Sequence, residues 1–184
     1  ASYLTVNISS PNTPGLRLLQ DESALSELLA AVKAALPVGG PPVFLKVAPD
    51  LEPADIDAIA RLSVGMVDAL IVSNTTISRP ALASAHAGET GGLSGAPLKT
   101  LAQQRMVDFA KATGGGLPLI GAGGIASAED AYARIRAGAS LVQLYSALVY
   151  EGPGLARRIN AGLADLLRRD GFANVAQAVG VDVR

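Results

Sequence analysis

Residues 7–13 read Asn-Ile-Ser-Ser-Pro-Asn-Thr and combine two amides, two serine hydroxyls and a proline in one short stretch. The proline fixes one backbone angle and a second proline directly follows the stretch, so we predict a stiff loop. The amides of Asn7 and Asn12 can bind the polar edge of a small molecule, and Ser10 between them is a candidate proton acceptor. Because serine is a weak base, it needs a neighbouring hydroxyl or a water to carry the proton onward, and Thr13 is the candidate for that relay. An ordinary turn is the alternative interpretation.

Lys46 lies within the apolar run 43–47, where a lysine is rare unless it is paired or functional. One interpretation is an ion pair with a nearby carboxylate such as Asp50. The other, which we favour, is a cation that stabilises an anion held above the end of the run. In that case the positive charge acts on a ligand rather than on the fold.

Polar side chains also end the next apolar run, in the sequence Ser73-Asn74-Thr75. An asparagine flanked by hydroxyls provides donors and acceptors suited to amides and to a planar heterocycle, although an asparagine turn is the alternative. The long loop that follows contains His86, which we expect at the surface, and ends in a glycine-rich stretch at Gly95. That loop could cover a ligand, and Gly95 would let the backbone come close to it.

Small residues end the last two apolar runs. Residues 121–125 read Gly-Ala-Gly-Gly-Ile and precede a helix start at Ser127, so N–H groups around Gly124 can approach an anion. The following run ends in Tyr145-Ser146, which adds further donors. A glycine turn by itself requires no ligand, but two such ends in tandem favour a phosphate site.

Five apolar runs must position these residues, and they span 3–8, 43–47, 69–73, 117–121 and 140–144. The runs are continuously apolar rather than alternating, which predicts strands buried on both faces of a parallel sheet. Capping residues, prolines and glycines predict helices over 21–36, 53–62, 97–113, from 127 to Gly138, and from about 153 to just before Gly171. The repeated strand–helix order predicts an α/β fold with right-handed crossovers.

Two architectures are compatible with this order: an open doubly wound sheet and a closed barrel. An open dinucleotide-binding sheet should carry G-x-G-x-x-G at its first helix, and this chain has no such motif. Polar residues instead follow all five runs, where barrel enzymes place their chemistry. A complete barrel takes about 250 residues and eight strands. We therefore predict that these 184 residues hold the last five units, strands 4–8, of a (β/α)8 TIM barrel.

Composition excludes several classes of function. With 15 basic and 16 acidic residues, the chain has no excess of charge for nucleic acid. The absence of cysteine excludes disulfides, thiolate metal sites and a cysteine base, and one histidine cannot make a multi-histidine metal site. No apolar run reaches the roughly 18 residues that cross a bilayer, and no signal-peptide pattern opens the sequence.

Six segments together resemble class 2 dihydroorotate dehydrogenases, in order and over essentially the whole chain. They are residues 7–17, 45–50, 73–76, 90–95, 120–125 and 141–146. That family oxidises dihydroorotate to orotate in pyrimidine synthesis, with bound FMN and then a membrane quinone as electron acceptors. Its class 1 relatives use a cysteine base. Because this chain has Ser10 and no cysteine, it is more similar to class 2.

The resemblance implies a role for each candidate residue. Ser10 would be the catalytic base that removes the C5 proton of dihydroorotate while a hydride passes from C6 to N5 of the flavin. The substrate-binding residues would be Asn7, Asn12, Asn74 and Thr75. The FMN-binding residues would be Asn7, Lys46, Ser73, Gly95, Gly124, Tyr145 and Ser146.

The resemblance also implies three strands and an N-terminal helical segment before Tyr3, with a quinone tunnel and contact with the cytoplasmic side of the membrane. Residues 1–184 would then be the C-terminal part of one FMN-binding domain, which we do not expect to be active by itself. Two alternatives stay open. One is a phosphate-binding barrel enzyme without flavin, which leaves Ser10 and Lys46 without a role. The other is a non-catalytic barrel fragment or interaction module. The sequence predicts no oligomeric state.

Overall fold

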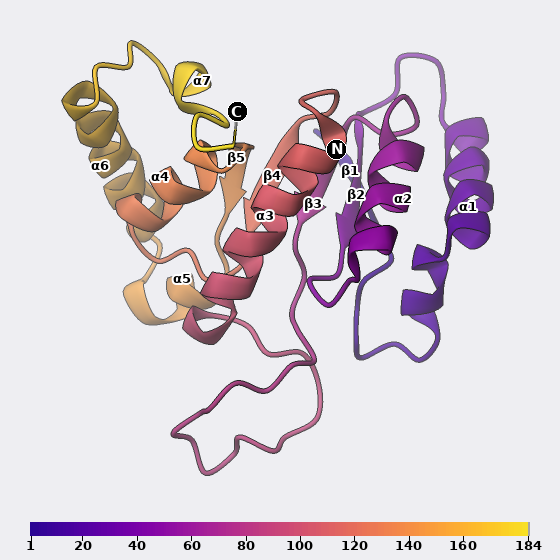
Figure 1. Ribbon diagram of the computed structural model, residues 1–184, viewed down its shortest axis with the longest axis horizontal. Helices are drawn as coiled ribbons and strands as arrows, with labels where there is room; N and C mark the ends of the chain where they lie inside the picture. The colour runs from indigo at the N-terminus through magenta and orange to yellow at the C-terminus, as the bar shows by residue number, and fades with distance from the viewer. Residues whose placement is uncertain (184) are drawn as a thin grey trace.

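Five parallel strands form a single sheet in the computed structural model, which describes residues 1–183 (Figure 1). They are β1 (Leu4–Asn7), β2 (Val43–Val47), β3 (Ala69–Val72), β4 (Leu119–Ala122) and β5 (Ala139–Gln143). The strands lie in sequence order, and each is parallel to its neighbours. The prediction of a parallel sheet is confirmed. Because all strands run the same way, the residues that follow them meet at one edge of the sheet.

Helices alternate with the strands and pack against one face of the sheet. They are α1 (Glu22–Ala35), α2 (Pro53–Ser63), α3 (Lys99–Thr113), α4 (Ala128–Arg136) and α6 (Leu155–Arg169). A doubly wound sheet reverses its strand order at a switch point, whereas this order is sequential throughout. Right-handed crossovers in one direction place every helix on the same side, as in a barrel wall. The choice of a partial barrel over a doubly wound sheet is thus confirmed.

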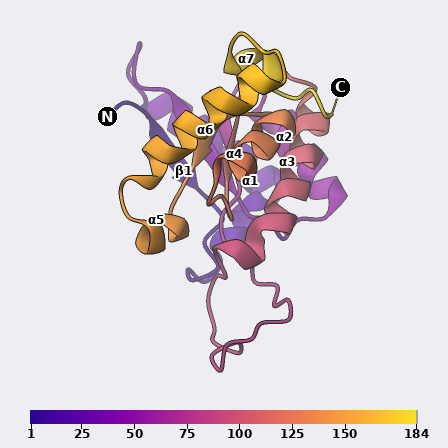
Figure 2. The ribbon, with the colours of Figure 1, turned by 90° about the vertical axis from the view of Figure 1, so that its left-hand side faces the viewer.

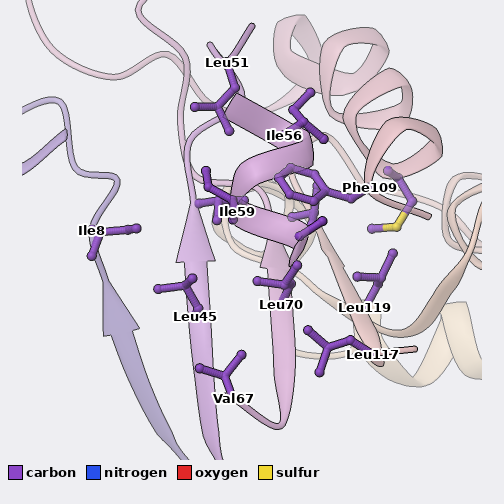
Figure 3. Close-up of a cluster of buried hydrophobic side chains, with 14 of the residues drawn as sticks. Ile8, Leu45, Leu51, Ile56, Ile59, Val67, Leu70, Phe109, Leu117 and Leu119 are labelled. Atoms are coloured by element: carbon purple, nitrogen blue, oxygen red, sulfur yellow. The ribbon is translucent and has the colours of Figure 1, made fainter. Parts of the chain in front are cut away.

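The main hydrophobic core lies between this wall of helices and the sheet (Figure 3). Leu45 and Leu70 extend from β2 and β3 toward Ile59 of α2 and Phe109 of α3, and all four are fully buried. Alternate residues point to the opposite face, where strand side chains form a second cluster that no helix joins: Phe44, Ala69, Ile71, Ile120 and Ala122. Burial on both faces explains why the strands are continuously apolar.

Helix boundaries follow local chemistry. The Asp21 side chain accepts from the Ser23 N–H at the start of α1, and Ser127 accepts from the Asp130 N–H at the start of α4, as the capping pattern predicts. Strand β4 begins at Leu119, two residues later than predicted, because Pro118 has no N–H to donate to a sheet.

Four short helices accompany these elements: η1 (Leu16–Gln20), η2 (Ala96–Leu98), α5 (Ser146–Glu151) and α7 (Val175–Ala178). None was predicted as an element of its own, although η2 overlaps the start of the helix predicted over 97–113. They span three to six residues, which is too short to show a helical period in the sequence. Figure 2 shows the longer α6 lying along α4 on the outside of the wall.

The segment between β3 and η2 projects from the body of the molecule (Figure 1). Its base is closed by two backbone hydrogen bonds between Thr76 and Leu93, of 3.1 and 2.8 Å. His86 is exposed in this segment, as expected. The projecting part does not lie over the sheet, so only its base, near Gly92 and Gly95, reaches the strand ends.

Candidate functional site

A cavity of about 800 Å³ opens at the ends of the strands. Most of the predicted site residues line it: Lys46, Ser73, Asn74, Thr75, Gly95, Gly124, Tyr145 and Ser146. Asn7, Ser10 and Asn12 are not part of its lining. They lie in and after β1, next to the cavity wall formed by Asn74 and Thr75.

Hydrogen bonds between amides and a serine join the β1 loop to the end of β3. The Asn74 Nδ2 donates to Ser9 Oγ at 3.0 Å and to Asn7 Oδ1 at 3.3 Å. Ser9 Oγ in turn donates to Asn7 Oδ1 at 2.8 Å, and the Thr75 N–H donates to Asn74 Oδ1 at 2.8 Å. Two predicted substrate ligands, Asn7 and Asn74, therefore orient one another. Ser9 is fully buried and was not predicted as a site residue.

Ser10 is half-buried, and its hydroxyl accepts from the Asn12 N–H at 3.3 Å. Asn12 is exposed, and a side chain on Gly91 would approach its Oδ1 to 3.2 Å. The predicted relay from Ser10 to Thr13 is not formed, because no hydrogen bond joins the two side chains in the described part of the chain.

An ion pair between Arg17 and Asp50 anchors the loop after β1, which carries Ser10. The Arg17 Nη1 lies 3.0 Å from Asp50 Oδ2, while Nε donates to the Ser9 carbonyl at 3.1 Å and Nη2 to the Thr75 carbonyl at 3.0 Å. One guanidinium thus connects the residue before Ser10 with the end of β3. No local pattern indicates these contacts, because Asp50 and Thr75 are 33 and 58 positions away from Arg17.

Asp50 also accepts from the Thr76 hydroxyl and from the Ile77 N–H. Burial raises the pKa of Asp50, but the hydrogen bonds from Thr76, Ile77 and Arg17 more than offset it and lower the pKa below its ordinary value. The carboxylate is therefore charged at neutral pH and holds three segments of the chain together.

Lys46 lies on the face of β2 that carries no helices and lines the cavity. Asp50, its candidate partner, is bonded to Arg17 instead, and no carboxylate within residues 1–183 forms an ion pair with Lys46. Burial lowers the pKa of the Lys46 ammonium. Of the two interpretations of this lysine, the ion pair with Asp50 is not formed; the role toward a ligand stays a prediction.

The turn after β4 comes close to the start of α3. Gly124 has a φ of +72°, and a Cβ there would lie 2.4 Å from the Lys99 Cα, so only glycine fits. At the start of α4, Asp130 accepts from the Ala126 N–H and donates its own N–H to Ser127. The N–H groups of Ala126 and Asp130 are therefore occupied.

The loops at the far side of the cavity are connected as well. The hydroxyls of Ser94 and Ser146 lie 2.9 Å apart, and Gly95 approaches the Ser146 Cβ closely enough that a Cβ on the glycine would be 3.5 Å away. Tyr145 is largely exposed at the rim. Gly95 and Ser146, two of the predicted FMN residues, therefore lie side by side in the lining of the cavity.

The family model described as dihydroorotate dehydrogenase matches residues 1–167. The chain belongs to the dihydroorotate dehydrogenase family. Similar curated relatives are named dihydroorotate dehydrogenase (quinone). The one from Novosphingobium aromaticivorans is 66% identical over 98% of this chain and 52% of its own length. The one from Sphingopyxis alaskensis is 68% identical over 98% of this chain and 51% of its own length. These names confirm the resemblance to the quinone-dependent class.

A crystal structure of DHODH from Eimeria tenella in complex with ferulenol superposes on the chain with a TM-score of 0.95 and 40% identity. The superposition covers all of this chain and 55% of the Eimeria chain. The chain thus spans about half the length of the curated relatives it matches, as expected for part of a barrel. Within the described residues, no helix has the length and apolar character to cross a membrane.

Proposed function

We propose that this chain provides the catalytic loop and most of the FMN site of a quinone-dependent dihydroorotate dehydrogenase. The observation that carries the proposal is that the Ser10 loop and Lys46 border the same cavity. The Ser10 loop is bonded through Asn7 and Asn74 to the wall of a cavity, and Lys46, which pairs with no carboxylate among residues 1–183, lines that cavity. The names of the relatives support dihydroorotate and a quinone as substrates. We also propose that the acceptor is a membrane quinone and that the protein attaches peripherally to the cytoplasmic side of the membrane.

The cavity suits a flavin nucleotide in size and chemistry. Its volume of about 800 Å³ falls within the range of roughly 300–1,000 Å³ for cofactor sites. Lys46 and Ser73 would hold the ring system or the start of the ribityl chain, with Asn7 at the edge of the ring. The ribityl chain and phosphate would lie along Gly95, Gly124, Tyr145 and Ser146.

FMN, when bound, supplies the two-electron chemistry by accepting the hydride from C6 of dihydroorotate and passing the electrons to a quinone. Ser10 would take the proton from C5, so that the C5–C6 bond becomes double. Asn7, Asn12, Asn74 and Thr75 would hold the carboxylate and amide edges of the substrate. Lys46 would stabilise the negative charge that develops in the cavity.

Anaerobic mixing with dihydroorotate tests the proposal on the native polypeptide that carries this sequence. We expect dihydroorotate to bleach the absorbance of bound FMN. Ser10→Ala should slow this bleaching by at least about a hundredfold, the loss expected for a general base, while FMN stays bound. Ser23→Ala, an exposed serine on the outer helix α1, is the matched control and should bleach at the wild-type rate.

Two results would contradict the proposal. Bound FMN that dihydroorotate does not bleach would exclude the dehydrogenase and leave a non-catalytic barrel. Binding of inorganic phosphate without any flavin would favour the phosphate-binding barrel enzyme instead. An unchanged rate in Ser10→Ala would remove only the role of Ser10.

A further inference from the structure

Arg134 is 1% exposed and is among the largest fully buried side chains of the chain. It extends from α4 to the end of β4, where Nη1 donates to the Ala122 carbonyl and Nη2 to the Gly123 carbonyl, both at 3.0 Å. Its Nε donates to Gln103 Oε1 at 2.9 Å. A guanidinium therefore lies directly behind the glycine turn that borders the cavity.

All three of these partners are neutral. Arg134 forms no ion pair within residues 1–183, and the carboxylate one turn earlier, Asp130, contacts Lys99 and the Ala126 N–H. Burial lowers the pKa of Arg134 to about 10, with a smaller opposing effect from Asp130. The side chain still carries its charge at neutral pH. A buried charge without a counter-charge in contact costs free energy that the fold must offset.

A glycine at position 121 leaves space for the Arg134 side chain. A Cβ on Gly121 would lie 2.3 Å from the Arg134 Cγ, so the side chain occupies the space that the missing Cβ leaves. The turn that Arg134 supports has positive φ at Gly123 and Gly124, of +99° and +72°. Glycines and arginine thus form one packed unit at the end of β4.

The hydrogen bonds of Arg134 also set the direction of the backbone. In a trans peptide the C=O of one residue and the N–H of the next point in opposite directions. Anchoring the carbonyls of Ala122 and Gly123 to Arg134 therefore turns the N–H groups of Gly123 and Gly124 away from it. Both glycines line the cavity, and within the described chain neither N–H donates to another group.

We propose that Arg134 is a positioning residue of the phosphate end of the cavity: it aims the N–H groups of the glycine turn at a phosphate and supplies positive charge behind them. This inference rests on the proposed function. The phosphate of the flavin nucleotide would be the counter-charge that the buried guanidinium lacks. A purely structural arginine would stabilise the turn without discriminating between ligands with and without phosphate.

Flavin binding to the flavin-free native polypeptide tests this distinction, with FMN and riboflavin as probes and fluorescence quenching as the measurement. The two ligands share the ring and ribityl chain and differ only in the phosphate. Arg134→Met should raise the Kd for FMN by about tenfold or more, the scale of one charge-assisted contact, and leave the Kd for riboflavin within about twofold. Arg134→Lys keeps the charge and should retain most of the preference for FMN.

Gln103→Glu is a second variant that keeps the arginine and its packing. It places a carboxylate at the Arg134 Nε, so that the charge behind the turn is neutralised while an acceptor remains. We expect the Kd for FMN to rise severalfold and that for riboflavin to stay unchanged. Gln104→Glu, the next residue on α3, adds the same charge beside Asp108 rather than Arg134 and should affect neither ligand.

The outcomes separate the two proposals. If the wild type binds FMN and the ratio of the two Kd values is unchanged in Arg134→Met and Gln103→Glu, the role of Arg134 is wrong. Equal weakening of FMN and riboflavin would show a merely structural arginine and would also overturn it. A wild type that binds neither flavin would overturn the proposed function and this role together.

Discussion

Lys46 places an ammonium group on the cavity face of β2 with no carboxylate partner among residues 1–183. Burial lowers its pKa, so the folded chain binds this proton less tightly than the unfolded chain does. Between the lowered and the ordinary pKa the unfolded chain holds more protons, and stability rises with pH in that window. Below the window the full cost of the buried charge opposes folding.

We therefore expect Lys46→Met to be more stable than the wild type in the flavin-free state at neutral pH. The difference should shrink as the pH rises through the lowered pKa, because the wild-type lysine then loses its charge. Urea unfolding across that range measures this, and Lys111→Met, an exposed lysine on α3, is the control that should show no such trend. Flavin reduction should be slower in Lys46→Met. A variant that is less stable at every pH would mean that Lys46 serves the fold.

Single residues were predictable where their type conflicted with their surroundings. A lysine in an apolar run and a serine between two amides are visible in the sequence alone. Ser9, Arg17 and Arg134 were missed, because their significance comes from partners far away in the sequence: Arg17 binds the Thr75 carbonyl 58 positions later. Pairing at that range depends on the folded topology and not on any local pattern.

Among the connecting elements, the loop after β1 and the end of β3 are joined through Asp50. Its lowered pKa means that the folded state binds the proton less tightly than the unfolded state. The resulting stability is fully present above the ordinary carboxyl pKa and is lost as the pH falls through the lowered value. Asp50→Asn should therefore cost about 1–3 kcal/mol at neutral pH, since charged hydrogen bonds become neutral ones.

Unfolding of Asp50→Asn and the wild type at a series of acidic pH values checks this expectation. The free-energy difference between them should decrease as the pH falls. Asp57→Asn, an exposed aspartate on α2, controls for the general effect of removing a negative charge. A difference that stays constant down to the lowest pH would show that the charge of Asp50 does not contribute.

The base of the projecting segment packs against Thr75 at Gly92. A Cβ on Gly92 would lie 2.0 Å from Thr75 Oγ1 and 3.0 Å from Pro11 Cγ, so Gly92→Ala must displace the segment or the two residues beneath it. We expect a loss of about 1–3 kcal/mol from overpacking and a raised KM for dihydroorotate. Gly88→Ala, with nothing within 4 Å of the new Cβ, should change neither quantity. Equal effects of both substitutions would contradict the packing role of Gly92.

Element types were predictable to different degrees. The five strands followed from continuous apolar runs, with ends displaced by no more than two residues, because burial on both faces leaves a signal that needs no tertiary information. The short helices η1 and α5 carry no such signal, because five and six residues are too few to show a helical period. The path of the projecting segment was not predictable either, because glycines and small residues permit many conformations.

At the largest scale, that of residues 1–183 taken together, the sheet is most deeply buried at its centre. Strand β3 has a neighbour on each side and all four of its residues are buried, whereas β1 pairs only with β2 within residues 1–183 and is mostly exposed. Backbone amides open with free energies that follow such differences in burial. Within residues 1–183, the loop that carries Ser10 follows the more exposed β1, while Lys46 and Asn74 lie on or next to the buried strands β2 and β3.

Amide hydrogen exchange of a polypeptide limited to residues 1–184 should show this gradient. We expect Ala69–Val72 to exchange slowest among the strands and Leu4–Asn7 to exchange fastest. A ligand that bridges Asn7 and Asn74 binds only when β1 is in place, so it should slow exchange in β1 more than in β3. FMN with orotate is the probe for this effect, and riboflavin alone is the control. Slower exchange in β1 than in β3 without ligand would show that β1 is stabilised by contacts beyond its pairing with β2.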